Sequence, residues 1–477
     1  MNLLSLPWVE LAVALPLVTA CGLHFVKNIE LSWRVAVAMT SLSFFMSILA
    51  WASTLHEVPS LGASYQSQLF GHVVLRLDWL GGPLFVLVAL LHLLTILTTA
   101  KVKMTRLSFS GHLLGESIRM ATFACIDPWP LIVLLSLAAL PPYREMVKRK
   151  KPTRVFLIHM LAFIVLLVVG WVGVERHATW GPVVLMFAVL LRSGTFPLHL
   201  WVSELLEHAT FGTAILFLTP IAGMYAALRL VFPVSPDWVM QTIGILSLVT
   251  AIYAAGLALV QTDPRRFFAQ LFLSHSSLVL VGLELHTPLS LTGALFLWPS
   301  VALSLGGLGM VLRAIEARHG KLSLKQYHGL YEQSPSLAVG FALMGLGSVG
   351  FPGTLGFVAA ELLVDGAISS SIAVGIVLVI AGALNGIAIL RIYFLIFTGP
   401  MQIPTIPIGI TLRERFGILV LGGLLLGGGL MPQIGVEYFH KVARALQNLP
   451  VESKNVVSDP LTVERSLRDT PPPEEFE

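Results

Sequence analysis

The sequence predicts an all-α membrane protein, a polytopic bundle of about fourteen transmembrane helices. The chain has 477 residues, of which 56% are hydrophobic and only 12% are charged. So much apolar side-chain surface cannot be buried in one aqueous core. Apolar runs also recur along nearly the whole chain, and most approach the ~20 residues that cross the hydrocarbon layer. We therefore expect one membrane domain and no soluble catalytic domain.

The expected spans follow from the apolar runs in chain order. The first seven are centred near residues 16, 44, 88, 117, 136, 164 and 190, and the others near residues 220, 250, 274, 303, 345, 381 and 422. The fourth is interrupted by Glu116, Arg119 and Asp127 before Pro128 and Pro130 break the helix.

The domain organisation follows from where the apolar character ends. We predict a transmembrane domain over residues 1–433, a short interfacial helix over 434–450 and a disordered polar tail over 451–477. The first apolar run has no basic segment before it and no small-residue cleavage site after it, so we expect it to be retained as a helix.

Basic residues alternate between loops, which predicts the orientation. Even-numbered loops hold mainly Arg176 and Arg229, whereas odd-numbered loops hold Lys101, Lys103, Arg106, the run 144–151, Arg265, Arg266, Arg318, Lys321, Lys325, Arg413 and Arg415. Because basic loops remain cytoplasmic, both termini are expected outside an inner membrane. This pattern accounts for the net charge of +4, so we expect no nucleic-acid partner.

The two cysteines do not indicate a cofactor. Cys21 and Cys125 lie in separate apolar segments and form neither a CxxC pair nor an iron–sulfur spacing. We expect no cofactor, no metal and no catalytic site in this chain.

Several short motifs occur in a fixed order. They are Arg76-Leu77-Asp78 in the third expected span, the stretch 191–201 with Arg192 and Pro197, Gln261-Thr262-Asp263-Pro264-Arg265-Arg266, Ser274-His275-Ser276, the stretch 350–357 followed by Glu361, and Arg391-Ile392-Tyr393-Phe394 in the thirteenth. This set, over roughly residues 70–400, resembles the antiporter-like subunits of respiratory complex I and of Mrp-type cation/proton antiporters. The resemblance implies two inverted five-helix repeats, each with one broken helix, and a polar axis that carries protons.

Five positions depart from the family pattern. The resemblance places the family's buried glutamate and its paired lysine at Ser136 and Arg192. It places two further lysines at Ile221 and Ala360, and a central histidine at Val301. An arginine cannot release its proton, whereas a buried lysine can be tuned to do so. The pair that usually stores protons is therefore missing.

Arg192 and its neighbours form the first half of the candidate proton path. Arg192 is either an electrostatic gate or a structural cation, neutralised by Glu204, by Glu207 or by carbonyl groups freed at Pro197. His199 is either a proton carrier, since imidazole titrates within the working pH range, or a cap on backbone exposed by the helix break.

The second half comprises His275, Glu361 and Asp365. Neighbouring serines of His275 can hold water, which favours a path-lining role, but a purely structural histidine is the alternative. Glu361 follows the Gly-Phe-Pro-Gly break and Asp365 lies one turn further on. They form either a carboxylate exit site or a helix end in interfacial water.

Three functions remain open. The first is a membrane subunit of a complex I-like, ion-translocating assembly in which redox chemistry happens elsewhere. The second keeps the fold with another partner, as in an Mrp-type antiporter or the membrane half of an inorganic-carbon uptake complex. The third is a non-conducting structural or assembly subunit. All three imply other membrane subunits as partners.

Overall fold

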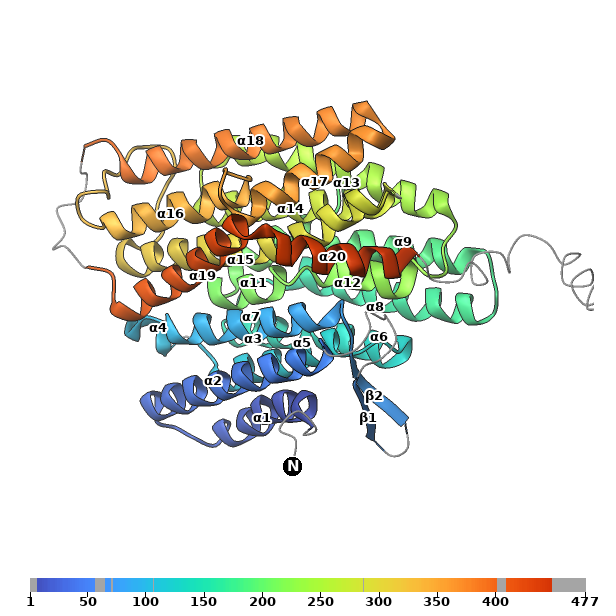
Figure 1. Cartoon of the computed structure of the whole chain (residues 1–477). Helices are drawn as coiled ribbons and strands as arrows, with labels where there is room; N and C mark the ends of the chain where they lie inside the picture. The colour runs from blue at the N-terminus through green and yellow to red at the C-terminus, as the bar shows by residue number, and fades with distance from the viewer. Residues whose placement is uncertain are drawn as a thin grey trace, which may run out of the picture.

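The computed structural model describes residues 7–55, 65–69, 72–105, 107–285, 287–400 and 409–447. Long helices running in roughly the same direction form almost all of it, with one β-hairpin at one end (Figure 1). The strands are β1 (Tyr65–Leu69) and β2 (His72–Leu77), which pair antiparallel. The helical bundle agrees with the predicted fold class, while the hairpin was not predicted.

The helices in chain order are α1 (Trp8–Leu23), α2 (Ile29–Thr54), α3 (Gly81–Leu97), α4 (Lys101–Met104), α5 (Phe109–Phe123), α6 (Pro128–Leu137), α7 (Leu140–Lys148), α8 (Arg154–Glu175), α9 (Trp180–Ser193), α10 (Leu200–His208), α11 (Phe211–Leu218), α12 (Ala222–Ala226), the π-helical turn η2 (Ala227–Val231), α13 (Asp237–Val260), α14 (Pro264–Glu284), α15 (Pro288–His319), α16 (Pro335–Ser348), α17 (Leu355–Ser370), α18 (Ile372–Phe397), α19 (Leu412–Leu430) and α20 (Pro432–Gln447).

Among the described residues, eight helical stretches are long and apolar enough to cross a membrane. The number is nine if α19 and α20, which meet at 81°, form one bent span. Four shorter helices, α1, α3, α9 and α16, are also apolar. The predicted span centres lie inside helices, except the one near residue 220, which falls between α11 and α12.

Local sequence signals explain where the two central helices begin. The Asp263 carboxylate accepts hydrogen bonds from the first backbone amides of α14, and Pro264 occupies the first helical position. Thr287 and Pro288 play the same roles at the start of α15. A polar cap satisfies an amide that lacks a helical partner, and proline at the first position has no amide to satisfy.

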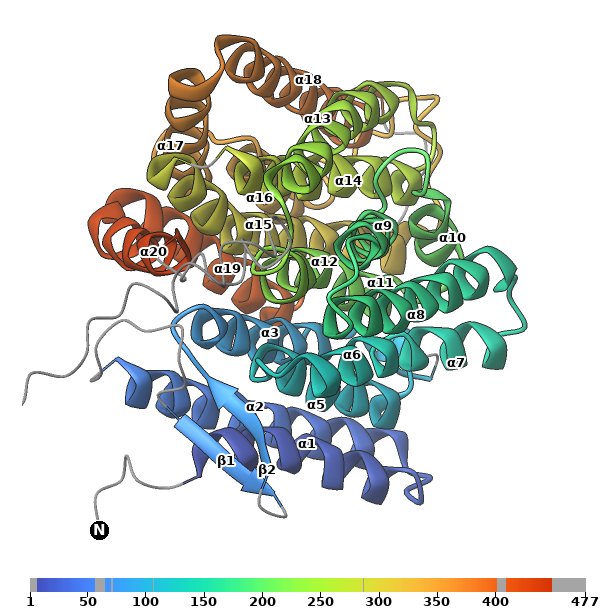
Figure 2. The same ribbon diagram turned by 90° about the vertical axis from the view of Figure 1, so that its right-hand side faces the viewer.

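Burial divides the bundle into inner and outer helices. The stretch from α11 to η2, together with α14 and α15, is almost wholly buried, whereas α2, α8 and α18 expose most of their apolar side chains. Figure 2 shows α15 near the middle of the bundle, and α18 and α2 at opposite edges. In a membrane the exposed apolar faces of the outer helices would contact lipid.

Ion pairs connect several of the basic loops at one end of the bundle. The Arg265 guanidinium donates to the Glu316 carboxylate over 2.7 and 2.9 Å and to the Leu206 carbonyl over 2.6 Å. Lys103 Nζ lies 3.5 Å from the same carboxylate. These residues come from α14, α15, α10 and α4, so four segments far apart in sequence meet at this basic end. Arg106 lies outside the described residues.

The opposite end carries the hairpin and corrects one sequence prediction. Arg76 and Leu77 were placed in the third span, but they belong to β2, and Asp78 follows before α3 begins. The Asp78 carboxylate accepts a hydrogen bond from the Gly81 amide over 2.8 Å. It also accepts two bonds of 2.7 Å from Arg229 in the middle of η2. Asp78 therefore joins the start of α3 to η2.

The fourth predicted span also needs correction. Glu116 and Arg119 do not interrupt it, because α5 runs unbroken through both and buries them. A charge inside a helix need not end it when the side chain faces protein instead of lipid.

Two helices break at the predicted places. Between α9 and α10, Gly194 has a positive φ of 71°, and a Cβ atom there would lie 2.8 Å from a methyl group of Leu273. Between α16 and α17, Gly350 and Gly353 also have positive φ, of 79° and 86°. Glycine adopts this backbone conformation without steric cost. A further break, not predicted, separates α11 from α12 at Ile221, where φ is 46°.

The C-terminal helix α20 overlaps the predicted interfacial helix. Its Tyr438 hydroxyl donates to the Trp79 carbonyl over 2.6 Å, and its His440 ring lies 3.2 Å from the Thr292 hydroxyl of α15. The helix therefore contacts the segment before α3 and helix α15. Its place at the membrane interface stays a prediction. The predicted tail over 451–477 lies outside the described residues.

Candidate functional site

Arg192 lies buried in the last turn of α9, with 5% of its surface exposed. Its guanidinium carbon lies 4.2 Å from the centre of the Phe217 ring and 5.4 Å from the Trp201 ring. One guanidinium nitrogen, Nη2, donates to the Phe217 carbonyl over 3.4 Å. Among the described residues, two aromatic rings and a carbonyl hold this cation instead of a carboxylate. Such contacts stabilise a desolvated cation by ~2 kcal/mol.

The two acidic residues proposed to neutralise Arg192 have other partners. Glu204 accepts hydrogen bonds from the backbone amides of Val155 and Phe156 and so caps the start of α8. Glu207 forms an ion pair with Arg266. Neither is placed to neutralise Arg192, so that hypothesis was wrong for both carboxylates.

His199 lies just after the first helix break and packs among aromatic rings. Its ring is 5.9 Å from that of Phe196, in a stacked arrangement, and 5.6 Å from that of Tyr253. Its Nδ1 atom is buried and has no hydrogen-bond partner among the described residues. A histidine nitrogen without a partner is available to exchange a proton, so the geometry is compatible with a carrier.

His275 connects α14 to the second helix break. Its Nδ1 lies 2.8 Å from the Leu271 carbonyl oxygen, and its Nε2 lies 3.0 Å from the Ser348 carbonyl oxygen at the end of α16. Carbonyl oxygens only accept hydrogen bonds, and a neutral imidazole has one N–H, so only the doubly protonated ring satisfies both contacts. Adding or removing a proton at His275 would therefore change the bond between α14 and this break.

Ser274, the residue before His275, bonds α14 to two further helices. The Ser274 hydroxyl donates to the Ala251 carbonyl of α13 over 2.8 Å and accepts from Asn385 of α18 over 2.8 Å. Four helices, α13, α14, α16 and α18, thus contribute polar groups next to the break. The sequence had identified the serine but not Asn385.

Glu361 and Asp365 lie apart from the buried histidines. Both are exposed on α17, and because they are four residues apart they share one face of that helix. No described contact joins either carboxylate to His275. They remain available to water or to a neighbouring subunit.

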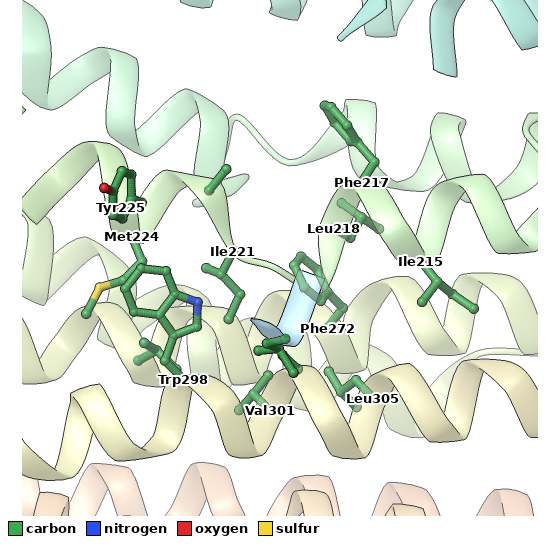
Figure 3. Close-up of a cluster of buried hydrophobic side chains, with 14 of the residues drawn as sticks. Ile215, Phe217, Leu218, Ile221, Met224, Tyr225, Phe272, Trp298, Val301 and Leu305 are labelled. Carbon is green, nitrogen blue, oxygen red and sulfur yellow. The ribbon is translucent and has the colours of Figure 1, made fainter. Parts of the chain in front are cut away.

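Apolar side chains occupy the middle of the bundle. Figure 3 shows Ile221 and Val301 facing the same space, beside Leu218, Phe272 and Leu305. All five are buried members of one hydrophobic core. Such side chains offer no hydrogen-bonding groups, so a proton crossing this cluster would need water to enter it.

Sequence reasoning missed a second set of buried polar residues, on α3 and α5. Arg119 donates to His92 Nε2 from Nη2 over 2.6 Å and from Nε over 3.3 Å, and the His92 ring lies 6.4 Å from that of His112. Glu116 is fully buried beside them. The signal was present in the spacing, because residues 112, 116 and 119 recur at three or four positions in an apolar helix and so share one face.

Comparison with known proteins bears on the resemblance predicted from the sequence. The family model described as "NADH:quinone oxidoreductase/Mrp antiporter, TM" matches residues 157–385. This segment contains both helix breaks, His275 and Glu361. Over this segment the chain resembles the antiporter-like membrane subunit family. The predicted resemblance is thereby confirmed. The α3–α5 residues lie outside the matched segment.

Two solved structures share the antiporter-like fold over almost the whole chain. Respiratory complex I from Thermus thermophilus contains a chain that is 22% identical, with a TM-score of 0.80, covering 92% of this chain and 99% of that one. The Mrp complex from Dietzia sp. contains one that is 18% identical, with a TM-score of 0.82, covering 96% and 100%.

Sequence similarity to curated antiporter-like subunits is more local. Subunit M of the F(420)H(2) dehydrogenase of Methanosarcina mazei is 32% identical over 185 residues, which are 38% of this chain and 37% of the relative. The matched region thus spans well under half of that relative's length.

Proposed function

We propose that this chain is a membrane subunit of an ion-translocating assembly, which moves protons or cations across an inner membrane while redox chemistry takes place in other subunits. The observation that carries the proposal is His275, whose two ring nitrogens contact α14 and the broken end of α16 inside the family-matched segment. A titratable group at a helix break can couple protonation to a change in helix packing.

The proposed function implies an architecture and a set of partners. The chain would cross the membrane about fourteen times as two inverted five-helix repeats around the breaks after α9 and α16, followed by an interfacial helix and a polar tail. Its partners would be other membrane subunits, since the relatives belong to multi-subunit complexes.

The proposed path uses the buried histidines and a fixed charge. His199 and His275 would carry protons and Arg192 would set the local potential without releasing one. Glu204 would hold the start of α8 beside the path, and Glu361 with Asp365 would form an outlet on the exposed face of α17.

A translocation measurement tests the path. In vesicles containing the assembled complex, His275→Ala and Glu361→Gln should each reduce proton movement by at least ~100-fold, the contribution of a positioned proton-transfer group. His440→Ala and Glu332→Gln serve as matched controls, because they lie on α20 and in the loop after α15, away from the path. Normal translocation in both path variants would contradict conduction by this route.

One observation favours a second candidate, a non-conducting scaffold subunit. The apolar cluster around Ile221 and Val301 fills the place where the family pattern has a lysine and a histidine (Figure 3). A scaffold would assemble and leave translocation unchanged in the His275 and Glu361 variants, so the same measurement separates the two functions.

The proposed orientation is a separate prediction. The basic end, with Lys103, Arg265 and the loop after Lys148, should face the cytoplasm, and both termini should lie outside. After residue 150, a fused reporter enzyme that works only in the cytoplasm should be active. After Gln447, a fused reporter enzyme that works only outside the membrane should be active. A cytoplasmic signal from the second fusion would contradict an even number of spans.

A further inference from the structure

A cavity of about 740 Å³ opens at the basic end of the bundle, between α5 and α7. Ser108, His112 and Arg119 line it from the α5 side, and Arg144 and Lys148 line it from α7. One water molecule occupies about 30 Å³ in the liquid, so the cavity has room for a connected chain of water. It extends from charged surface groups to residues of α5 that the bundle buries.

The cavity reaches both neighbours of a buried carboxyl group. Glu116 is 0% exposed, and the polar side chain beside its carboxyl group is Ser43 of α2, whose hydroxyl donates to the Ala12 carbonyl over 3.0 Å. It lies four residues after His112 and three before Arg119, so all three side chains share one face of α5. His112 Nε2 is buried without a partner in the described part of the chain.

Arg119 is held in place and stays a donor. The His92 Nδ1 lies 2.8 Å from the Val88 carbonyl, so Nδ1 carries the hydrogen and the Nε2 lone pair accepts from Arg119. A Cβ atom at Gly115 would lie 2.5 Å from the Arg119 Nη2 atom, so glycine makes room for the guanidinium. His92 thus keeps one tautomer while it holds Arg119.

Three arginines and one glutamate are further charged groups near His112 and Glu116. Arg119 acts electrostatically on Glu116, Arg313 of α15 acts on His112, and Arg192 acts on Arg119. The arginines keep their protons at any accessible pH. The acidic group in the cavity wall, Glu145, accepts hydrogen bonds from Thr210 and Thr213. His112 and Glu116 are therefore the groups on this face that are free to exchange a proton.

We propose that His112 and Glu116 form a proton-loading site on α5, filled from the basic end through this cavity. A hydronium ion in the cavity gives a proton to His112 Nε2 and leaves as water. The N–H bond then breaks as an O–H bond forms on the Glu116 carboxylate. This inference rests on the proposed translocation function, and it places the loading carboxyl group on α5, whereas Ser136 on α6 occupies the position of the family's glutamate.

Thiol labelling tests whether water reaches the site. In a Cys21→Ser background, a membrane-impermeant thiol reagent should modify Leu114→Cys, whose side chain lines the cavity, when applied at the basic end. Leu113→Cys is the matched control, since Leu113 is fully buried and does not line the cavity. Equal labelling of the two, or labelling of Leu114→Cys only from the opposite side, would overturn the access route.

Infrared spectroscopy of the assembled complex tests the carboxyl group. The pH-difference spectrum should contain a protonated-carboxyl band that is absent in Glu116→Gln and shifted in Glu116→Asp, while Glu332→Gln leaves it unchanged. If Glu116→Gln does not assemble, the shift in Glu116→Asp decides the matter. A band unchanged in both variants would overturn the proposal.

Translocation separates this inference from the function on which it rests. Glu116→Gln should abolish proton uptake, and His112→Gln should slow it and change its pH profile. If His275→Ala abolishes translocation and Glu116→Gln does not, the loading site is wrong and the function stands. If neither variant changes translocation, both proposals fail.

Discussion

Replacing Asp78 with Ala should destabilise the protein by about 3–5 kcal/mol, because it leaves a buried guanidinium without its counter-charge. Asp78 is 0% exposed and accepts two hydrogen bonds of 2.7 Å from Arg229, whose guanidinium also lies 5.0 Å from the centre of the Tyr225 ring. A loss of this size is a large part of the stability of most proteins. We expect a sharply lower yield and a lower melting temperature in detergent.

The chain offers a matched control at the same end of the bundle. Asp127 lies 3.8 Å from Arg76, and both side chains are about one-third exposed, so Asp127→Ala should cost no more than ~1 kcal/mol. Replacing both buried partners, as Asp78→Leu with Arg229→Met, should recover much of the stability because no unpaired charge remains. Equal melting temperatures for Asp78→Ala and Asp127→Ala would contradict this account.

Introducing a lysine at Ile221 should also be severely destabilising. Ile221 is 3% exposed, and in Figure 3 its side chain faces Val301 and Phe272. A lysine there would place an ammonium group among apolar side chains, at a cost of about 3 kcal/mol or more in the middle of a membrane span. The measurement is the melting temperature of Ile221→Lys in the purified complex, together with its proton movement in vesicles.

Ile221→Leu is the control for this substitution. It keeps the side-chain volume, which usually costs less than ~1.5 kcal/mol, and it removes a β-branched side chain from a backbone with φ of 46°. If Ile221→Lys were as stable as Ile221→Leu and increased proton movement, the centre of the bundle would have to contain water. That result would contradict a dry apolar cluster.

The helices and their breaks followed from local sequence. Long apolar runs predicted where the spans are centred, and Gly194, Gly350 and Gly353 lie at the two predicted interruptions. These features are decided within a few residues of the chain, by side-chain hydrophobicity and by the backbone freedom of glycine. The break at Ile221 was not predicted because the apolar run continues through it, although Pro220 beside it was a local signal for a helix break.

The partners of the buried charges depended on packing. Glu204 and Glu207 follow Arg192 closely in the chain, yet one caps α8 and the other pairs with Arg266. Asp78 and Arg229 are 151 residues apart and bond directly. Electrostatic pairing depends on the distance between two charges in space. The number of residues between them does not predict that distance when they lie on different helices.

By itself, the sequence determined that this is a helical membrane protein that resembles the antiporter-like family, with two glycine-marked breaks and a basic set of loops. Only the tertiary structure decided that Arg192 contacts aromatic rings, that the centre of the bundle is apolar and that His112 and Arg119, on either side of the buried Glu116, line a cavity. The physical reason is that hydrophobic runs and glycine positions act locally, whereas the cost of burying a charge depends on the groups that neighbouring helices place around it.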